Sequence, residues 1–287
     1  METENKILAC VDRSHYADHV ADYAAWVARR MALPLEFLHV IDRHPERGSG
    51  EDHSGAIGIG AQEKLLAKLS QEDTARAHTA HEEGRLLLNR LRQRAMEAGV
   101  NFTDTRQRHG SLEETLAEQE AGVRMFVLGR RGEAAEHTHR DIGRHVERVV
   151  RSLHKPIFTV TDAFREPRRA LLAFDGSAVT RRGVELIAAC PLFRDMPMHL
   201  LMSGKPVQEA PKHFAAAKAK LEAAGLEVPA ALLPGDPESI IARYVFEQEI
   251  DILIIGAYSH SPLRSLLLGS KTTDLLRASR IPTLLLR

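Results

Sequence analysis

The same series of segments occurs twice in this chain of 287 residues, and the repeat restricts the possible folds more than any other feature. The matching pairs are 7–14 (ILACVDRS) with 171–177 (LLAFDGS), 125–132 (MFVLGRRG) with 252–259 (ILIIGAYS), and 155–160 (KPIFTV) with 281–286 (IPTLLL). Three matches in the same order indicate a duplicated domain. A site that occurs twice can be compared with itself, so differences between the copies show which one kept its chemistry.

Short apolar runs alternate with amphipathic stretches in both copies, which predicts parallel sheets with right-handed crossovers. The predicted strands are 6–12, 35–41, 101–108, 124–129, 156–160, 169–175, 198–203, 226–233, 251–256 and 282–286. The predicted helices are 15–31, 78–98, 111–121, 143–153, 178–190, 208–224, 237–249 and 269–279. We therefore predict two tandem α/β domains of the doubly wound, Rossmann-like type, at 1–162 and 163–287, with a short linker at 161–167.

Composition excludes several classes of protein. The chain is 44% hydrophobic and 27% charged with a formal net charge of zero, so no global field recruits nucleic acid or an anionic membrane. Cys10 and Cys190 lie in apolar stretches without CxxC spacing, which favours core packing in a reducing compartment. No signal peptide and no run long enough to span a bilayer is visible, so the expected location is the cytoplasm.

The first copy carries an insertion. The offset between the copies falls from 163 at the Asp12–Asp175 pair to 125 at the Gly110–Gly235 pair, so the first copy has 38 extra residues, which we place at about 43–80. Long loops in compact domains are usually functional or disordered.

The composition of this insertion changes along its length. Five glycines fall within 48–60, and Leu65, Leu66 and Leu69 follow in a helical pattern from Gln62. We predict a flexible tether and then a short helix that covers an apolar groove near the carboxyl ends of the first domain's strands.

The second copy contains a candidate phosphate site. Gly256 and Ser259 follow a predicted strand, and Gly269 and Ser270 open the next helix, with Lys271 and Thr272 in its first turn. Glycine lets a phosphate approach the backbone, and a helix start offers unpaired N–H groups to anions. The alternative interpretation is that Gly256 only turns the chain and Ser270 only caps a helix.

A second cluster, Asp175-Gly176-Ser177, ends the first strand of the same copy. In open parallel sheets, ligands bind at the carboxyl ends of strands where the winding reverses. Asp175 is therefore a candidate acceptor for a base or a ribose. It is equally a candidate helix cap, and the two roles are compatible.

The first copy contains equivalents of these site residues, but their spacing and residue types differ from those of the second copy. Asp12, Ser14, Gly129, Gly132 and Gly143 are retained, but ten residues instead of nine precede Gly143, and Arg144 replaces the hydroxyl residue. Arg130, Arg131, Arg140 and Arg148 also make this region basic. An anion site built from guanidinium groups is one interpretation. We favour a degenerate copy whose charges are solvated.

On these residues the chain resembles the universal stress protein family in its tandem, two-domain form. The family pattern is an aspartate after the first strand and G-x2-G-x9-G-[ST] after the fourth. Asp175, Gly256, Gly269 and Ser270 match this pattern, while Ser259 stands in place of the second glycine. The resemblance implies strand order 3-2-1-4-5 in each domain. It also implies a pseudo-dimer in which 156–160 and 282–286 pair antiparallel.

The resemblance further implies a cytoplasmic stress-response protein that binds ATP or a related small ligand, mainly in its second domain. No residue pair suggests a committed general base, so strong catalysis is not expected. The alternatives are a slow ATPase, or a scaffold that binds a protein or an apolar ligand through its first domain. No metal is expected beyond Mg²⁺ that accompanies a nucleotide. Partners beyond the intrachain pseudo-dimer are left open, including a homodimer.

Overall fold

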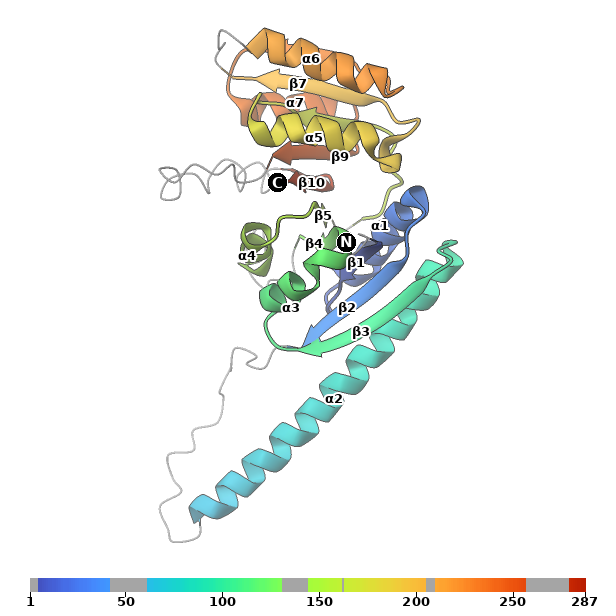
Figure 1. Ribbon diagram of the computed structural model, residues 1–287. Helices are drawn as coiled ribbons and strands as arrows, with labels where there is room; N and C mark the ends of the chain where they lie inside the picture. Colours follow the sequence, from blue (N-terminus) through green and yellow to red (C-terminus); the bar gives the residue numbers. More distant parts are fainter. Residues whose placement is uncertain (1–4, 42–60, 131–143, 162, 205–209, 257–278) are drawn as a thin grey trace.

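The computed structural model describes residues 5–41, 61–130, 144–161, 163–204, 210–256 and 279–287. Ten strands in this part of the chain form one continuous sheet, in the order β3-β2-β1-β4-β5-β10-β9-β6-β7-β8. Read from either outer edge, each half has the predicted order 3-2-1-4-5. Figure 1 shows the two halves stacked along this sheet.

The first half contains strands and helices in regular alternation. Its elements are β1 (Lys6–Cys10), α1 (Tyr16–Met31), β2 (Leu35–Ile41), α2 (Ala61–Glu97), β3 (Thr103–His109), α3 (Leu112–Gln119), the 3-10 turn η1 (Glu120–Gly122), β4 (Val123–Gly129), α4 (Arg144–Ser152) and β5 (Ile157–Val160). Every strand pairing within this half is parallel.

The second half repeats the series. Its elements are β6 (Ala170–Ala173), α5 (Ala178–Ala189), the 3-10 turn η3 (Pro191–Phe193), β7 (Met198–Ser203), α6 (Ala210–Ala223), β8 (Ala230–Leu233), α7 (Pro237–Glu247), β9 (Ile252–Gly256) and β10 (Thr283–Leu286). The predicted helix 269–279 lies outside the described residues up to position 278.

Equivalent positions start equivalent helices. Ser111 caps α3 by accepting a hydrogen bond from the Glu114 amide, and Asp236 caps α7 by accepting one from the Ser239 amide. These side chains satisfy amides that the first helical turn leaves without a partner. Ser111 and Asp236 differ by the offset of 125, so the duplication extends to the helix caps.

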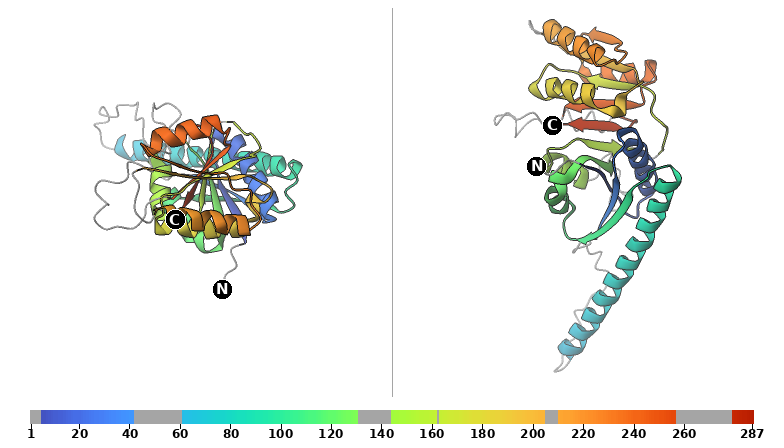
Figure 2. Two further views of the ribbon diagram at one scale, coloured as in Figure 1. Left: turned by 90° about the horizontal axis from the view of Figure 1, so that it is seen from above. Right: turned by 45° about the vertical axis from the view of Figure 1, so that its right-hand side comes forward.

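The two halves meet at an antiparallel seam between β5 and β10, as predicted. Pro156 and Pro282 immediately precede these strands, where a missing N–H is tolerated. The pairing removes two exposed sheet edges at once. The views in Figure 2 show the strands of both halves twisting as a single sheet.

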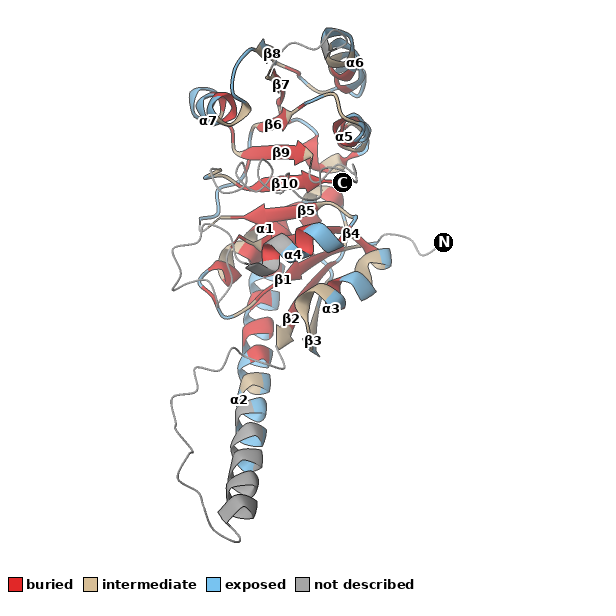
Figure 3. Ribbon diagram, turned by 90° about the vertical axis from the view of Figure 1, so that its left-hand side faces the viewer, coloured by how far each residue is buried: buried red, intermediate tan, exposed pale blue. Residues whose placement is uncertain are grey.

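Helices cover both faces of the sheet, and each face has an apolar core that crosses the seam. One core lies under α1, α2, α5 and α6, and the other under α3, α4 and α7. Buried strands such as β5, β9 and β10 lie at the centre in Figure 3. Because both cores include residues of both halves, the halves are packed as one body.

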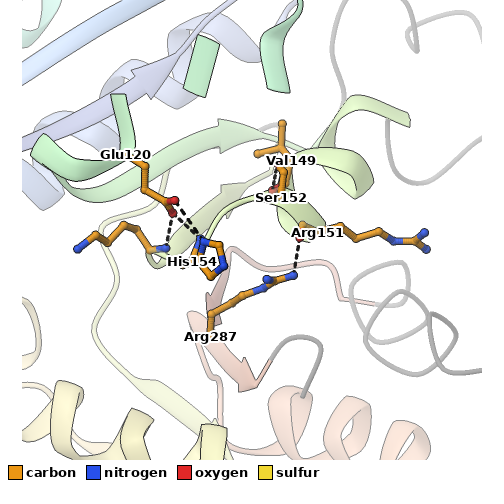
Figure 4. Close-up of polar contacts among 7 residues, drawn as sticks. Glu120, Val149, Arg151, Ser152, His154 and Arg287 are labelled. Carbon is orange, nitrogen blue, oxygen red and sulfur yellow. Dashed lines mark hydrogen bonds and ion pairs between the residues drawn. The ribbon is translucent and has the colours of Figure 1, made fainter. Parts of the chain in front are cut away.

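Polar contacts also fix the halves to each other. Figure 4 shows Arg287, at the end of the chain, donating a hydrogen bond of 2.8 Å to the carbonyl oxygen of Arg151. In the same region the Glu120 carboxylate accepts hydrogen bonds from the backbone amides of His154 and Lys155. Glu120 thereby fixes the turn between α4 and β5, the strand that forms the seam.

The insertion differs from its prediction. Helix α2 is a single helix of 37 residues and not a short one, and its amino-terminal half projects beyond the carboxyl ends of β2 and β3 (Figure 1). The described side chains from Gln71 to Thr79 are exposed, whereas those of Leu65, Leu66 and Leu69, which we predicted to cover an apolar groove, lie outside the described side chains. The reason is composition: 61–83 contains neither glycine nor proline and is rich in strong helix formers, so the helix continues outward. The predicted tether at 48–60 lies outside the described residues.

Candidate functional site

The carboxyl ends of β6 and β9 lie side by side in the second half. These strands pair in parallel with Ala173 opposite Ile255, so the chain leaves both at the same edge of the sheet. Asp175 follows β6 by two residues, and Gly256 is the last residue of β9. The structure therefore brings together these two predicted site residues, from segments about 80 positions apart.

Asp175 is held by hydrogen bonds to one of its two carboxylate oxygens. Oδ1 accepts from the backbone amide of Ser177 at 2.9 Å and from the Thr180 hydroxyl at 2.7 Å. Ser177 caps α5, because its hydroxyl oxygen accepts a hydrogen bond from the Thr180 amide at 3.3 Å. Oδ2 has no hydrogen bond to any described residue, and Asp175 is exposed. A carboxylate oriented in this way can accept a hydroxyl or amino proton of a ligand.

Two glycines lie at this edge, each at a position where another residue would be strained or crowded. Gly176 has a φ of 74°, in the left-handed region that favours glycine. A side chain at Gly256 would place its Cβ 3.1 Å from Cγ2 of Thr180 and 3.2 Å from Cγ1 of Val179. The end of β9 therefore packs closely against the start of α5, whose first turn directs unpaired amides and the positive dipole end to this edge. The remaining predicted residues, Ser259, Gly269, Ser270, Lys271 and Thr272, lie outside the described residues.

The first half has a similar arrangement around Asp12. Oδ1 of Asp12 accepts hydrogen bonds from the backbone amide and the hydroxyl of Ser14, which is buried. Ala17 occupies the position of Thr180, so the side-chain hydroxyl that reaches the aspartate comes from Ser14 in the first half and from Thr180 in the second.

The end of β4 departs further from its counterpart. After Gly129, Arg130 is 9% exposed: its amide donates to the carbonyl of Val160, and its guanidinium donates across the seam to the carbonyl of Ser279. The prediction of a solvated charge is wrong for this residue, because the seam buries it and supplies an acceptor. Gly132 and Gly143 lie outside the described residues, and Arg144 is described only as the first residue of α4.

The profile of the universal stress protein family matches this chain twice, over residues 4–161 and 166–287. The chain belongs to the universal stress protein family. It is 32% identical over 284 residues to universal stress protein Slr1230 of Synechocystis, which covers 98% of this chain and 99% of the relative.

Solved structures show the same fold for this universal stress protein. A universal stress protein from Archaeoglobus fulgidus is 16% identical with a TM-score of 0.72, over 99% of this chain and 96% of that one. A putative universal stress protein from Pseudomonas aeruginosa is also 16% identical with a TM-score of 0.64, over 98% and 92%. At these identities the likeness concerns the fold alone.

Sequence reasoning did not identify Thr180 as a residue of this universal stress protein's site. Its position could have indicated the role, because Thr180 lies three residues after the capping residue Ser177. From there its hydroxyl reaches back to Asp175, which precedes the helix. The burial of Arg130 had no local signal, because it depends on how the two domains meet.

The described part of the chain can also be searched for reactive cysteines, metal-ligating groups and membrane-spanning helices. Cys10 and Cys190 are both buried, as predicted, and burial raises the pKa of both thiols. The described residues contain no group of three or more His, Cys, Asp or Glu side chains placed to hold a metal ion. Among them, no helix combines the length and apolar character needed to cross a bilayer.

Proposed function

We propose that this universal stress protein binds ATP or a related nucleotide at the carboxyl edge of its second domain, and acts in a cytoplasmic stress response without strong catalysis. The observation that carries this proposal is the orientation of Asp175, whose Oδ1 is fixed by Ser177 and Thr180 while Oδ2 has no partner among the described residues. Gly176 and Gly256 lie at the same edge, and a Cβ at Gly256 would crowd the start of α5.

The remaining contacts are proposed from the family pattern. Gly269 and Ser270 would open the phosphate-binding helix, with Ser259, Lys271 and Thr272 as further donors. Mg²⁺, if present, would accompany the nucleotide, because no described group of side chains is placed to hold a metal by itself.

Binding without strong catalysis follows from the donors that the site offers. Amides, hydroxyls and one carboxylate hold a nucleotide in its ground state. Acceleration of phosphoryl transfer requires groups that act preferentially on the transition state, such as a positioned water and a charge clamp. Lys271 is a candidate clamp without a matching base. Turnover above about one per second would favour the alternative, an ATPase.

The duplication supplies a matched pair of variants for the test. Asp175→Asn and Asp12→Asn change equivalent aspartates, and each variant is titrated with a fluorescent ATP analogue. We expect Asp175→Asn to weaken binding about tenfold or more, through loss of a charge-assisted hydrogen bond, and Asp12→Asn to change it little. Gly269→Val and Gly143→Val form a second pair with the same expected asymmetry. Equal losses in both domains contradict the proposal.

We also propose domain boundaries at 1–162 and 163–287. The linker then passes along α1, where the Tyr23 hydroxyl donates to the carbonyl of Ala163 at 3.1 Å and accepts from the Arg165 amide at 3.3 Å. These contacts fix the start of the second domain against the first.

A further inference from the structure

A cleft of about 370 Å³ lies in the first domain near the amino end of β1. The proposed nucleotide site, in contrast, lies at the carboxyl ends of strands in the second domain. Lys6, Arg106, Glu118 and Gln119 line it, together with Asn5 and the turn 121–122. Its volume falls within the range of small-molecule sites.

Two cations of this cleft share one buried carboxylate. Glu36, whose side chain is 6% exposed, pairs with Lys6 Nζ at 2.8 Å and with Arg106 Nε at 3.0 Å. Lys6 donates a hydrogen bond to Oε2, whereas Arg106 faces Oε1 as an ion pair without hydrogen-bond geometry, so Lys6 is held more firmly than Arg106. Arg106 is still partly exposed, and neither of its Nη atoms has a hydrogen-bond partner among the described residues. The two Nη groups of the guanidinium can therefore donate hydrogen bonds to a ligand, and their planar arrangement suits a second carboxylate.

Two aromatic rings stand at the equivalent place in the second domain. The strand registers align Glu36 with His199, and the matched helix caps align Gln119 with Tyr244. His199 and Tyr244 are both buried and form a T-shaped ring pair with centroids 5.7 Å apart, joined by a hydrogen bond of 3.1 Å.

The charge also differs between the domains. The position of Arg106 is held by Ala231 in the second domain, because both residues pair with the equivalent leucines of the preceding strand. The first domain thus has Arg106 and Gln119 where the second domain has Ala231 and Tyr244. Lys6 corresponds to Arg169, so a cation is present at that position in both domains, and the guanidinium of Arg106 is the charge that is particular to the first domain.

We propose that this cleft binds a small organic carboxylate, held by the Arg106 fork and the Lys6 ammonium, at a site separate from the nucleotide edge. A singly charged ligand fits better than phosphate, because Glu36 and Glu118 repel a second negative charge. Gln119 adds an adaptable amide: its Nε2 makes one long hydrogen bond of 3.5 Å to Thr115, and its Oε1 has no partner among the described residues.

The test is an NMR titration of the full-length, ¹⁵N-labelled protein with acetate, and separately with inorganic phosphate at equal ionic strength. We expect saturable shifts of the Asn5, Lys6 and Gly122 amides with acetate, with a Kd on the order of 1–10 mM for so small a ligand. Absence of saturation, or tighter binding of phosphate than of acetate, overturns the proposal.

Four variants make the result specific. Arg106→Gln should weaken acetate binding about tenfold, whereas Arg108→Gln, an exposed neighbour on the same strand that does not line the cleft, should not. Gln119→Tyr should abolish binding by restoring the ring of the second domain. Glu118→Gln, a surface change that spares the fold, should strengthen binding about twofold by removing a like charge. Equal losses in Arg106→Gln and Arg108→Gln, or weaker binding in Glu118→Gln, contradict the site.

Discussion

Thr159 of β5 and Thr283 of β10 lie directly opposite each other across the seam between the domains, and the Thr159 hydroxyl donates a hydrogen bond of 3.1 Å to the carbonyl of Thr283. Both residues are almost completely buried. Thr159→Val keeps the shape and removes this donor, so we expect a loss of about 1 kcal/mol in the free energy of unfolding, measured by urea denaturation.

Thr103 provides the control, because its hydroxyl oxygen is buried without a hydrogen-bond partner in the described structure. Thr103→Val removes a polar group that gains nothing from folding, so it should be neutral or stabilising. If both variants lose the same free energy, the seam hydrogen bond contributes nothing of its own.

The seam was predictable because the sequence ends each copy with a Pro-led apolar strand, and the family resemblance implies how these strands pair. Which polar residues the seam buries was not predictable. Arg130 resembled the other arginines of a basic stretch, yet it is 9% exposed and donates to the Ser279 carbonyl. Its burial is decided by a partner 149 positions away, which no local pattern encodes.

Gly84 sets how closely α2 approaches the sheet. A Cβ at this position would lie 2.5 Å from Nε2 of Gln107 and 2.6 Å from Cδ2 of His39. Gly84→Ala should therefore destabilise the protein by about 1–3 kcal/mol, although the same change in a solvated helix stabilises by about 1 kcal/mol. Gly122→Ala is the control, since no atom lies within 4 Å of its added Cβ. A more stable Gly84→Ala variant would show that α2 is not packed this closely.

His199 should make stability depend on pH. Burial lowers its pKa, and the charge of Arg169 lowers it further. Below a pH of about 6.5 the unfolded chain takes up a proton that the folded state resists, so stability present above this pH is lost as the pH falls. His199→Asn removes the titration and keeps a side-chain donor, so its stability should fall less between pH 7.5 and 5 than that of the wild type. Urea midpoints across this range measure the difference, and parallel curves contradict the assignment.

Thr180 should matter for ligand binding more than for folding. Thr180→Val removes the hydroxyl that fixes Oδ1 of Asp175 at 2.7 Å and leaves the packing against Gly256 nearly unchanged. We expect affinity for a fluorescent ATP analogue to fall about threefold to tenfold, because the carboxylate becomes less ordered. Stability should change by less than about 1 kcal/mol. A large loss of stability with unchanged affinity would make Thr180 a purely structural residue.

The candidate site was predictable in its position but not in its detail. Asp175 and Gly256 were found from spacing alone, because carboxyl ends of neighbouring parallel strands must share an edge. Glu36 and Arg106 carried no comparable signal. They are 70 positions apart, and only the pairing of β2 with β3 brings them together.

The projecting half of α2 should contribute little to the stability of the domains. The described side chains from Gln71 to Thr79 are exposed, and the first residue of the helix that is described as buried is Gly84. A helix without a packed face gains little from tertiary contacts and frays from its free end. Deletion of 45–75 should therefore change the free energy of unfolding by less than about 0.5 kcal/mol. Hydrogen exchange in the intact protein should be fast through position 79 and slow around Leu87–Leu91, which are buried at their apolar positions. Strong protection of 63–70, or a large loss of stability on deletion, would show that this arm packs against a surface after all.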